Sequence, residues 1–392
     1  MSESNFDYII AGGGLAGLSL LYYIINDTNL KNKRVLVIDS VEKNQNDRTW
    51  CFWEKEKEFY EPLINAKWSK LKFESPTLSK IFQLREYQYK LIKSGDYYKF
   101  IKDDAKDKNV IFKTETIISI EDIENVVKVK TENNEYTASY AFNSTSLFNP
   151  IMTKENTLLQ HFEGWFIKTE ENHFDPTIGT LMDFTLSQER GIAFMYVLPI
   201  SYNEALVEFT LFSESFLEPN EYKRVLENYI SNKMKVKHYV VTHNEFGVIP
   251  MTKAVFKNSM KKNSKIINIG TAGGYTKAST GYTFKFVHKK LKKIVEKLSA
   301  NKNPILKIKF REKMFYWYDM TLLDVLLKQK CSGEEVFTSL FKKNNPERVL
   351  AFLADESNHF DEFKIRNSVP LKPFMISGIK QLLPKRFNVT CF

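Results

Sequence analysis

The chain has 392 residues, of which 43% are hydrophobic and 27% are charged, and its formal net charge is +10. This length and this ordinary globular balance allow two or three packed units with a large core. The lysines are scattered and no nucleic-acid-binding motif accompanies them, which excludes nucleic acid from the expected partners and makes an anionic membrane surface the better match for the diffuse positive charge.

The first residues form a short acidic segment that runs directly into an apolar strand, which is not the pattern of a signal peptide. No stretch approaches the ~18 apolar residues that a membrane-spanning helix needs. The cysteines, Cys51, Cys331 and Cys391, are far apart, so we expect free thiols in a reducing cytoplasm. No cysteine pair has zinc-ligand spacing and the histidines do not cluster, so we expect no metal site.

A glycine motif follows the first predicted strand. The strand runs into Gly12-x-Gly14-x-x-Gly17, a helix follows, and a second apolar strand ends at Asp39. In this order Gly12 allows the tight turn, Gly14 allows a pyrophosphate to approach the backbone, and Gly17 allows the helix to pack on the strand. Asp39 stands where an acid accepts hydrogen bonds from ribose hydroxyls. A glycine-rich turn in another α/β unit is the alternative, which the complete strand–helix–strand order disfavours.

The middle of the chain predicts a helix and many strands. Helical spacing over residues 86–106 predicts a helix, and residues 110–114, 126–131 and 135–142 predict three short strands in an antiparallel meander. Alternating patterns then predict a second sheet, from residues 164–168, 180–185, 193–199, 205–212 and 239–247, with a helix over 221–234.

A second glycine-rich segment follows a late strand at 265–269. It reads Gly270-Thr271-Ala-Gly273-Gly274 and leads into a basic helix over about 282–298, and from residue 311 the pattern is helical. This layout is typical of two-domain FAD enzymes, in which a late glycine segment contacts the flavin. We therefore predict an α/β fold: a Rossmann-type, flavin-monooxygenase-like FAD-binding domain, a second, mainly antiparallel-sheet substrate domain and a helical C-terminal region.

The predicted FAD-binding domain is discontinuous, because the late strand must join the N-terminal ones. We assign it residues 1–75, 110–155 and 255–300. The substrate domain takes residues 76–109 and 156–254, and the helical region takes 301–392.

Several segments together resemble a known family. They are Arg48-Thr-Trp50-Cys-Phe52-Trp53, Val207-Glu-Phe-Thr-Leu-Phe-Ser213, Phe246-Gly-Val-Ile-Pro-Met251, Gly270-Thr-Ala-Gly-Gly-Tyr-Thr-Lys-Ala-Ser-Thr-Gly-Tyr282, Phe315-Tyr-x-Tyr-Asp319 and Phe337-x-x-Leu-Phe341. In this order they resemble bacterial lycopene β-cyclases of the flavoprotein type, over about residues 6–376. Two departures are Thr271, where many related flavoproteins have Asp, and Ala278, where proline is commoner.

The resemblance implies an FAD-containing enzyme that is active with reduced flavin, with NAD(P)H as the expected reductant. Its substrates would be lycopene and related carotenoids with acyclic ψ ends, converted to β-carotene via γ-carotene in a net isomerisation. It also implies a cytoplasmic protein bound peripherally to the inner face of the cell membrane. The docking segment we expect is residues 363–387, where apolar side chains alternate with Lys372, Lys380, Lys385 and Arg386. A capping tail packed on the core is an equally open interpretation.

Cyclisation of a ψ end needs a proton donor in an apolar wall, and a buried carboxylic acid with a raised pKa fits that need. Glu208 is the candidate, because the resemblance places the family's functional glutamate in this Glu-Phe-Thr segment. Without the resemblance, a glutamate on the wet face of an edge strand would be favoured. The expected cofactor-binding residues are Gly12, Gly14, Gly17, Asp39, Arg48, Gly270, Thr271, Gly273 and Gly274.

Other residues carry two open interpretations each. Trp50, Phe52 and Trp53 either wall the flavin or polyene or belong to the core. For Glu245, surface charge at a strand end is favoured over a place near the substrate; Asp319 and His161 are expected to be structural. The competing functions are an FAD-dependent hydroxylase, a prenyl or carotenoid reductase, and a non-catalytic prenyl-binding protein on the same fold.

Overall fold

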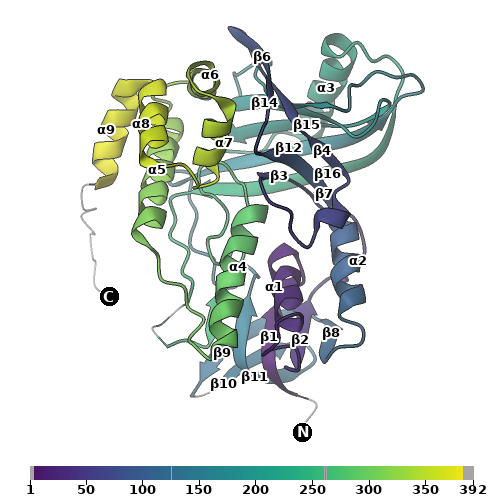
Figure 1. The fold of residues 1–392 in the computed structure, drawn as a ribbon, viewed down its shortest axis with the longest axis vertical. Helices are drawn as coiled ribbons and strands as arrows, with labels where there is room; N and C mark the ends of the chain where they lie inside the picture. The colour runs from purple at the N-terminus through teal and green to yellow at the C-terminus, as the bar shows by residue number, and fades with distance from the viewer. Residues whose placement is uncertain (1–3, 125, 260, 262, 383–392) are drawn as a thin grey trace.

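The structure is a computed structural model that describes residues 4–124, 126–259, 261 and 263–382. Two large sheets lie at opposite ends of the molecule, with a helical layer in yellow beside the upper sheet and helices α1 and α4 side by side near the lower one (Figure 1). The predicted α/β fold, with a Rossmann-type unit, a second sheet and a helical C-terminal region, is confirmed. No helix of the described part of the chain is both long enough and apolar enough to span a bilayer.

The first sheet holds the N-terminal glycine turn. Its order is β8-β2-β1-β11-β10-β9, and β17 pairs with β11. The strands are β1 (Asn5–Ala11), β2 (Val35–Asp39), β8 (Val110–Thr114), β9 (Ile117–Ile123), β10 (Val126–Thr131), β11 (Glu135–Asn143) and β17 (Ile266–Asn268). Helices α1 (Leu15–Ile25) and α4 (Phe284–Ser299) bury their apolar sides with Tyr8 and Ile10 of β1. The late strand therefore joins the N-terminal ones, as predicted, because β17 runs parallel to β11.

Two local predictions were wrong. Residues 86–106 are not one helix: β7 (Gln88–Lys93) comes first and α2 (Ser94–Asp104) follows. β7 lies between β3 (Thr49–Glu54) and β4 (Ala66–Trp68) in a small sheet, and this pairing overrides the helical spacing. The meander prediction also missed β9 and misplaced β8, which pairs in parallel with β2 instead.

The second sheet has the order β16-β12-β15-β14-β13-β5-β6 and is mainly antiparallel. Its strands are β5 (Lys70–Ser75), β6 (Leu78–Gln83), β12 (Thr157–Lys168), β13 (Ile178–Asp183), β14 (Ile192–Pro199), β15 (Glu204–Ser213) and β16 (Val240–Thr252). Each strand predicted between residues 161 and 247 is present, as is the helix α3 (Pro219–Asn228), which continues as a short π-helix (Tyr229–Lys233).

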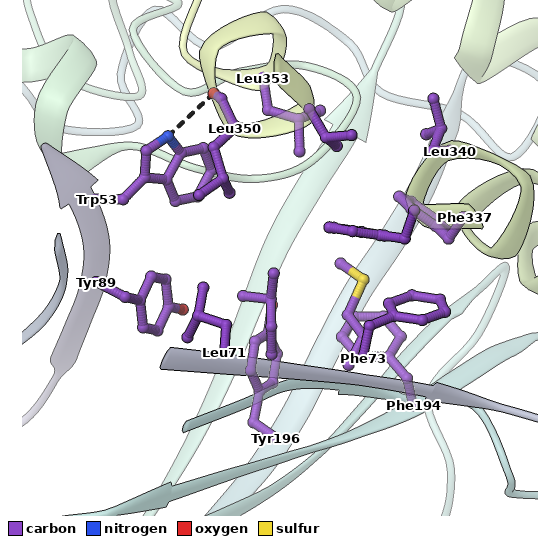
Figure 2. Close-up of a cluster of buried hydrophobic side chains, with 14 of the residues drawn as sticks. Trp53, Leu71, Phe73, Tyr89, Phe194, Tyr196, Phe337, Leu340, Leu350 and Leu353 are labelled. Atoms are coloured by element: carbon purple, nitrogen blue, oxygen red, sulfur yellow. Dashed lines mark hydrogen bonds between the residues drawn. The ribbon is translucent and has the colours of Figure 1, made fainter. Parts of the chain in front are cut away.

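Alternation along β15 separates two faces of this sheet. Val207 and Phe209 pack with α3, whereas Leu206 and Phe212 belong to a core shared with the C-terminal helices. Those helices are α5 (Phe310–Leu327), α6 (Gly333–Lys343), α7 (Pro346–Leu353), α8 (His359–Ser368) and α9 (Leu371–Leu382). Figure 2 shows this shared core, in which the indole N–H of Trp53 donates to the carbonyl of Leu350 at 3.0 Å. The assignment of the chain to domains by residue range stays a prediction.

Candidate functional site

A cavity of about 390 Å³ joins segments that are far apart in the sequence. Its lining includes Gly14 at the start of α1, Arg48 before β3, Glu208 on β15 and Thr271 in the late glycine segment. The other predicted cofactor residues do not line the cavity but belong to the two glycine turns or contact them: Gly12, Gly17, Asp39, Gly270, Gly273 and Gly274. The structure thus brings the predicted acid and the predicted phosphate-binding turn to one cavity, which we call the site cavity.

The N-terminal turn needs two of its three glycines for its own geometry. Gly12 has a φ of +101°, and an added Cβ there would lie 2.3 Å from the hydroxyl oxygen of Ser144. An added Cβ on Gly17 would lie 1.9 Å from the carbonyl oxygen of Gly12. A Cβ on Gly14, by contrast, would meet no atom within 4 Å. Gly14 therefore leaves open space at the N-terminus of α1, where unpaired N–H groups favour an anion.

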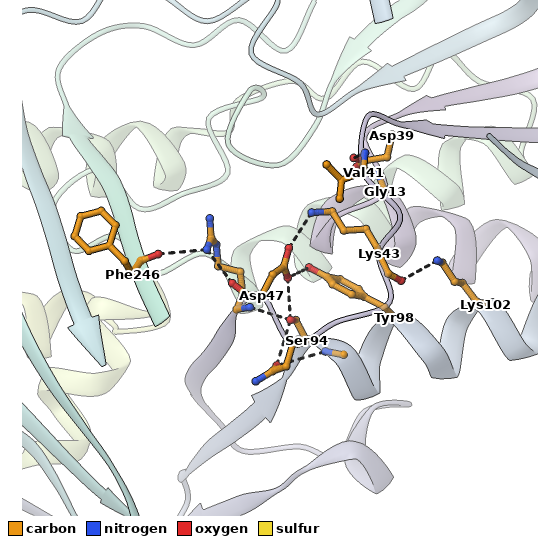
Figure 3. Close-up of polar contacts among 12 residues, drawn as sticks. Gly13, Asp39, Val41, Lys43, Asp47, Ser94, Tyr98, Lys102 and Phe246 are labelled. Carbon is orange, nitrogen blue, oxygen red and sulfur yellow. Dashed lines mark hydrogen bonds and ion pairs between the residues drawn. The ribbon is translucent and has the colours of Figure 1, made fainter. Parts of the chain in front are cut away.

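Asp39 holds this turn closed. Its carboxylate accepts hydrogen bonds from the backbone N–H of Gly13 at 2.7 Å and of Val41 at 3.0 Å (Figure 3). The predicted contact with ribose hydroxyls stays a prediction. The structure adds a role that sequence reasoning missed, because Asp39 links the end of β2 to the glycine turn.

Arg48 is held in the cavity wall by its own loop. Its guanidinium donates to the carbonyl of Asp47 at 2.8 Å and to that of Phe246 on β16 at 3.4 Å. The Asp47 carboxylate accepts from Lys43 at 2.8 Å and from the Tyr98 hydroxyl at 2.9 Å (Figure 3). Burial opposes its ionisation, but these hydrogen bonds outweigh burial and lower the pKa of Asp47. Arg48 thus brings a positive charge to the cavity lining.

The late glycine segment packs against the first turn of α1. An added Cβ on Gly270, whose φ is +60°, would lie 2.7 Å from the Cβ of Ala16. An added Cβ on Gly273 would lie 2.4 Å from the carbonyl oxygen of Asn268. Both positions therefore require glycine, and the two glycine segments meet at the start of α1.

Beyond this contact the chain forms the loop that ends at α4. Gly274 and Gly281 have φ values of +69° and +74°, so both turns need the left-handed region. The hydroxyl of Thr271 lines the cavity and lies 3.1 Å from that of Thr276. The loop therefore presents a hydroxyl group to the cavity at position 271.

Glu208 belongs to a row of paired residues across four strands. It pairs with Tyr196 on β14 and with Gly164 on β12, and Gly164 pairs with Glu245 on β16. Directly paired residues share one face of a sheet, so both carboxyl groups lie on the same face, and Glu208 lines the site cavity. Burial and the neighbouring charge of Glu245 raise the pKa of Glu208 to about 8, although a hydrogen bond from Thr210 opposes the shift. Glu208 is therefore mainly protonated at neutral pH.

The sequence favours a surface position for Glu245, and this expectation is wrong. Only 7% of Glu245 is exposed, and the Thr49 hydroxyl donates to its carboxylate at 2.9 Å. Burial raises its pKa as well, against the hydrogen bond from Thr49 and the charge of Arg48. The register through Gly164 that brings it near Glu208 cannot be read from local sequence.

Further residues of the cavity escaped the sequence analysis. The hydroxyls of Tyr196 and Tyr282 are hydrogen-bonded to each other. Burial raises the pKa of both phenols, which keeps them neutral. Gln160 and Thr280 are each only 7% exposed. The buried side-chain oxygen of each has no hydrogen-bond partner. Both residues line the cavity. Buried polar atoms of this kind are rarely left unpaired, so they point to a ligand.

The remaining candidates divide between cavity and core. Trp50 lines the site cavity, whereas Phe52 and Trp53 are 3% exposed and belong to the hydrophobic core. His161 is structural, as expected: it is fully buried between Tyr222 and Ser213, and burial lowers its pKa to about 4.

Asp319 is structural as well, since its carboxylate accepts from Ser279 at 2.7 Å and pairs with Lys277 at 2.8 Å. These contacts hold the loop before α4 from behind. The expectation that Asp319 is a structural hydrogen-bond partner is therefore confirmed.

Residues 7–377 match the family described as lycopene cyclase protein. The chain belongs to the lycopene cyclase family. The resemblance found in the sequence is thereby confirmed for nearly the whole chain. None of the curated proteins compared matches this chain.

Solved structures of similar fold are distant in sequence. A flavoprotein/dehydrogenase from Cytophaga hutchinsonii has a TM-score of 0.61 at 13% identity, with 96% of this lycopene cyclase family chain and 100% of that chain covered. A geranylgeranyl bacteriochlorophyll reductase-like protein from Thermoplasma acidophilum has a TM-score of 0.57 at 14% identity, with 97% of each chain covered. An HpxO variant from Klebsiella pneumoniae, complexed with FAD, has a TM-score of 0.61 at 11% identity, with 93% and 100% covered. These likenesses show the fold.

Proposed function

We propose that this member of the lycopene cyclase family is an FAD-dependent lycopene β-cyclase. It would convert the ψ ends of lycopene to β rings, giving β-carotene via γ-carotene. The observation that carries the proposal is the position of Glu208, a carboxylic acid with a pKa of about 8, in the same cavity as Gly14 at the N-terminus of α1.

The residues of the site cavity fit a flavin dinucleotide. The open space beside Gly14 suits a pyrophosphate, and Arg48 adds positive charge to the same cavity. Gln160 offers an unpaired acceptor and Thr280 an unpaired hydroxyl, and a flavin ring has polar atoms for both. When bound and reduced by NAD(P)H, FAD would supply negative charge that stabilises a carbocation.

The acid chemistry falls to Glu208. Its carboxyl proton would add to the terminal double bond of the ψ end, and the next double bond would close the ring on the resulting cation. Loss of the C6 proton to the Glu208–Glu245 pair would then form the ring double bond and restore the protein. Proton gain and loss balance, so substrate and product are isomers. The neutral phenols of Tyr196 and Tyr282 line the cavity and offer no charged nucleophile that would trap the cation.

Product analysis separates this proposal from its competitors. The purified holoprotein would be given lycopene and a reductant in H₂O and in D₂O. A cyclase yields a product of unchanged mass in H₂O and one deuterium for each ring formed in D₂O. Added oxygen would indicate a hydroxylase and added hydrogen a reductase, and a protein without bound FAD would point to a prenyl-binding role; each result would overturn the proposal.

We also propose that the protein takes its substrate from the membrane through helices α8 and α9. Large apolar side chains of these helices are more than half exposed: Phe360, Phe363, Leu371, Met375, Ile376, Ile379 and Leu382, which we call the α8–α9 patch. Helix α9 carries Lys372 and Lys380 and no acid, which suits an anionic lipid surface. Residues 383–387 of the expected docking segment lie outside the described residues.

A further inference from the structure

A second cavity of about 460 Å³ lies within the C-terminal helices. Its lining is mostly apolar, and we call it the apolar cavity. Side chains from five helices reach it, among them Leu322, Phe337, Leu340, Leu353, Phe363 and Ile379. Protein interiors are normally close-packed, so a hollow of this size within a helical layer is unusual. No sequence motif predicts it.

One loop separates the apolar cavity from the site cavity. Ser279 lines the apolar cavity, and the next residue, Thr280, lines the site cavity. Consecutive Cα atoms are only about 3.8 Å apart, so at this point the wall is a single thickness of chain. The loop is anchored by Lys277, whose ammonium group pairs with Asp319 at 2.8 Å and with Asp355 at 2.7 Å.

At its other end the apolar cavity reaches the α8–α9 patch. Helix α9 is fixed to α5 on one side, where the Trp317 indole N–H donates to the carbonyl of Gly378 at 3.0 Å. Four of its apolar side chains both line the cavity and are exposed: Leu371 by 55%, Met375 by 52%, Ile379 by 57% and Leu382 by 68%. The surface patch and the cavity are therefore continuous.

Two basic side chains line the cavity, which is otherwise mostly apolar. Lys277 is neutralised by two carboxylates, and Arg366 is exposed, with its guanidinium 6.0 Å from the centre of the Phe363 ring. The apolar side chains that make up most of the lining therefore favour a hydrocarbon chain as the occupant. A carotenoid hydrocarbon has no polar group, and the site cavity of about 390 Å³ is too small to hold all of it. We propose that the apolar cavity binds the hydrocarbon chain of an isoprenoid substrate, which enters from the membrane at the α8–α9 patch and meets the site cavity at the Ser279–Thr280 wall. This inference rests on the proposed function.

Photo-crosslinking tests the inference without turnover. The full-length FAD-loaded protein is mixed with anionic vesicles that contain a diazirine-bearing isoprenoid hydrocarbon, irradiated, and mapped by peptide mass spectrometry. Labels are expected on α5 and α9 near Trp317 and Met375. Leu340→Trp should reduce them about fivefold or more by filling the cavity, whereas the volume-conserving control Leu340→Met should keep them.

The distribution of the labels and a phospholipid probe give the outcomes that would overturn the inference. Labels confined to other segments, or unchanged in a folded Leu340→Trp protein, would exclude the cavity as the binding site. Stronger cavity labelling by a phospholipid with a diazirine-bearing acyl chain would assign the cavity to membrane lipid instead. Product analysis on the same sample separates the two proposals: rings without cavity labels refute this inference alone, and cavity labels without rings refute the cyclase function alone.

Discussion

The site cavity and the apolar cavity share a wall but are built in different ways. Strand register and glycine turns form the first, which is lined by ionisable groups such as Glu208 and Arg48, with Glu245 buried beside Glu208. Helix packing forms the second, whose lining is mostly apolar and whose Lys277 and Asp319 pair with each other. The difference indicates a division of labour, in which one region supplies chemistry and the other holds an apolar chain. Substitutions in the two regions should therefore fail in different ways.

The largest effect is expected at the acid. Glu208→Gln keeps the shape of the side chain and removes its exchangeable proton, so β-ring formation should fall by about 10²–10⁴-fold, the usual contribution of general acid–base catalysis. FAD content should stay unchanged, which absorbance checks. The matched control is Glu163→Gln on β12, whose carboxylate accepts from Trp165 and which does not line the cavity. Near wild-type ring formation by Glu208→Gln would refute the assignment.

Loss of one buried charge in the helical region should lower the stability of the protein. Asp324 on α5 is 1% exposed and pairs with Lys253 at 2.7 Å and with Lys330 at 2.9 Å, and it accepts from Ser377 of α9. Burial opposes its ionisation, but these lysines lower its pKa far below the usual range.

Asp324→Asn removes the buried negative charge that these lysines share and should cost about 3–5 kcal/mol of unfolding free energy. Because the folded pKa is depressed, this stabilisation is present above the ordinary aspartate pKa of about 3.9 and declines as the pH falls below it. Denaturant unfolding at pH 7 and at pH 3 measures both effects. Equal stability of variant and wild type at pH 7 would contradict the ion-pair account.

Cofactor binding should depend on Gly14 without the fold depending on it. Gly14→Val places a side chain in the open space beside α1, so FAD content after purification should fall at least about tenfold, as a side chain obstructs the approach of a pyrophosphate. Circular dichroism should stay unchanged. Gly17→Val is the contrasting variant, because its Cβ would collide with the backbone of Gly12 and should disrupt folding. Full flavin content in Gly14→Val would contradict the placement of the pyrophosphate beside Gly14.

The smallest effect is expected at the membrane surface. Changing Lys372 and Lys380 to Ser should weaken binding to anionic vesicles, since each basic residue near such a surface contributes about 1 kcal/mol. Raising the salt concentration should weaken wild-type binding in the same way. Vesicle sedimentation measures both, with neutral vesicles as the control. Binding that neither change affects would move the docking surface away from α9.

The sequence predicted the features that local pattern or motif determines. The glycine turns, the alternating strands of the second sheet and the late strand at residue 265 follow from such signals. The helical spacing predicts helix where β7 forms, because pairing with β3 and β4, rather than its own spacing, decides the conformation of this segment. Glu245 was misjudged because its burial depends on pairing with Gly164. The apolar cavity depends on how five helices pack, which no single segment records.

The protonation state of Glu208 tests the central claim most directly. Infrared difference spectroscopy between the wild type and Glu208→Gln would follow the carbonyl stretch of the protonated carboxyl group across a pH series. The account predicts that this band is present at pH 7 and disappears as the pH rises through about 8, and that ring formation falls over the same range because the acid form is lost. A Glu208 that is already ionised at pH 7, in a protein that still forms β rings, would contradict it.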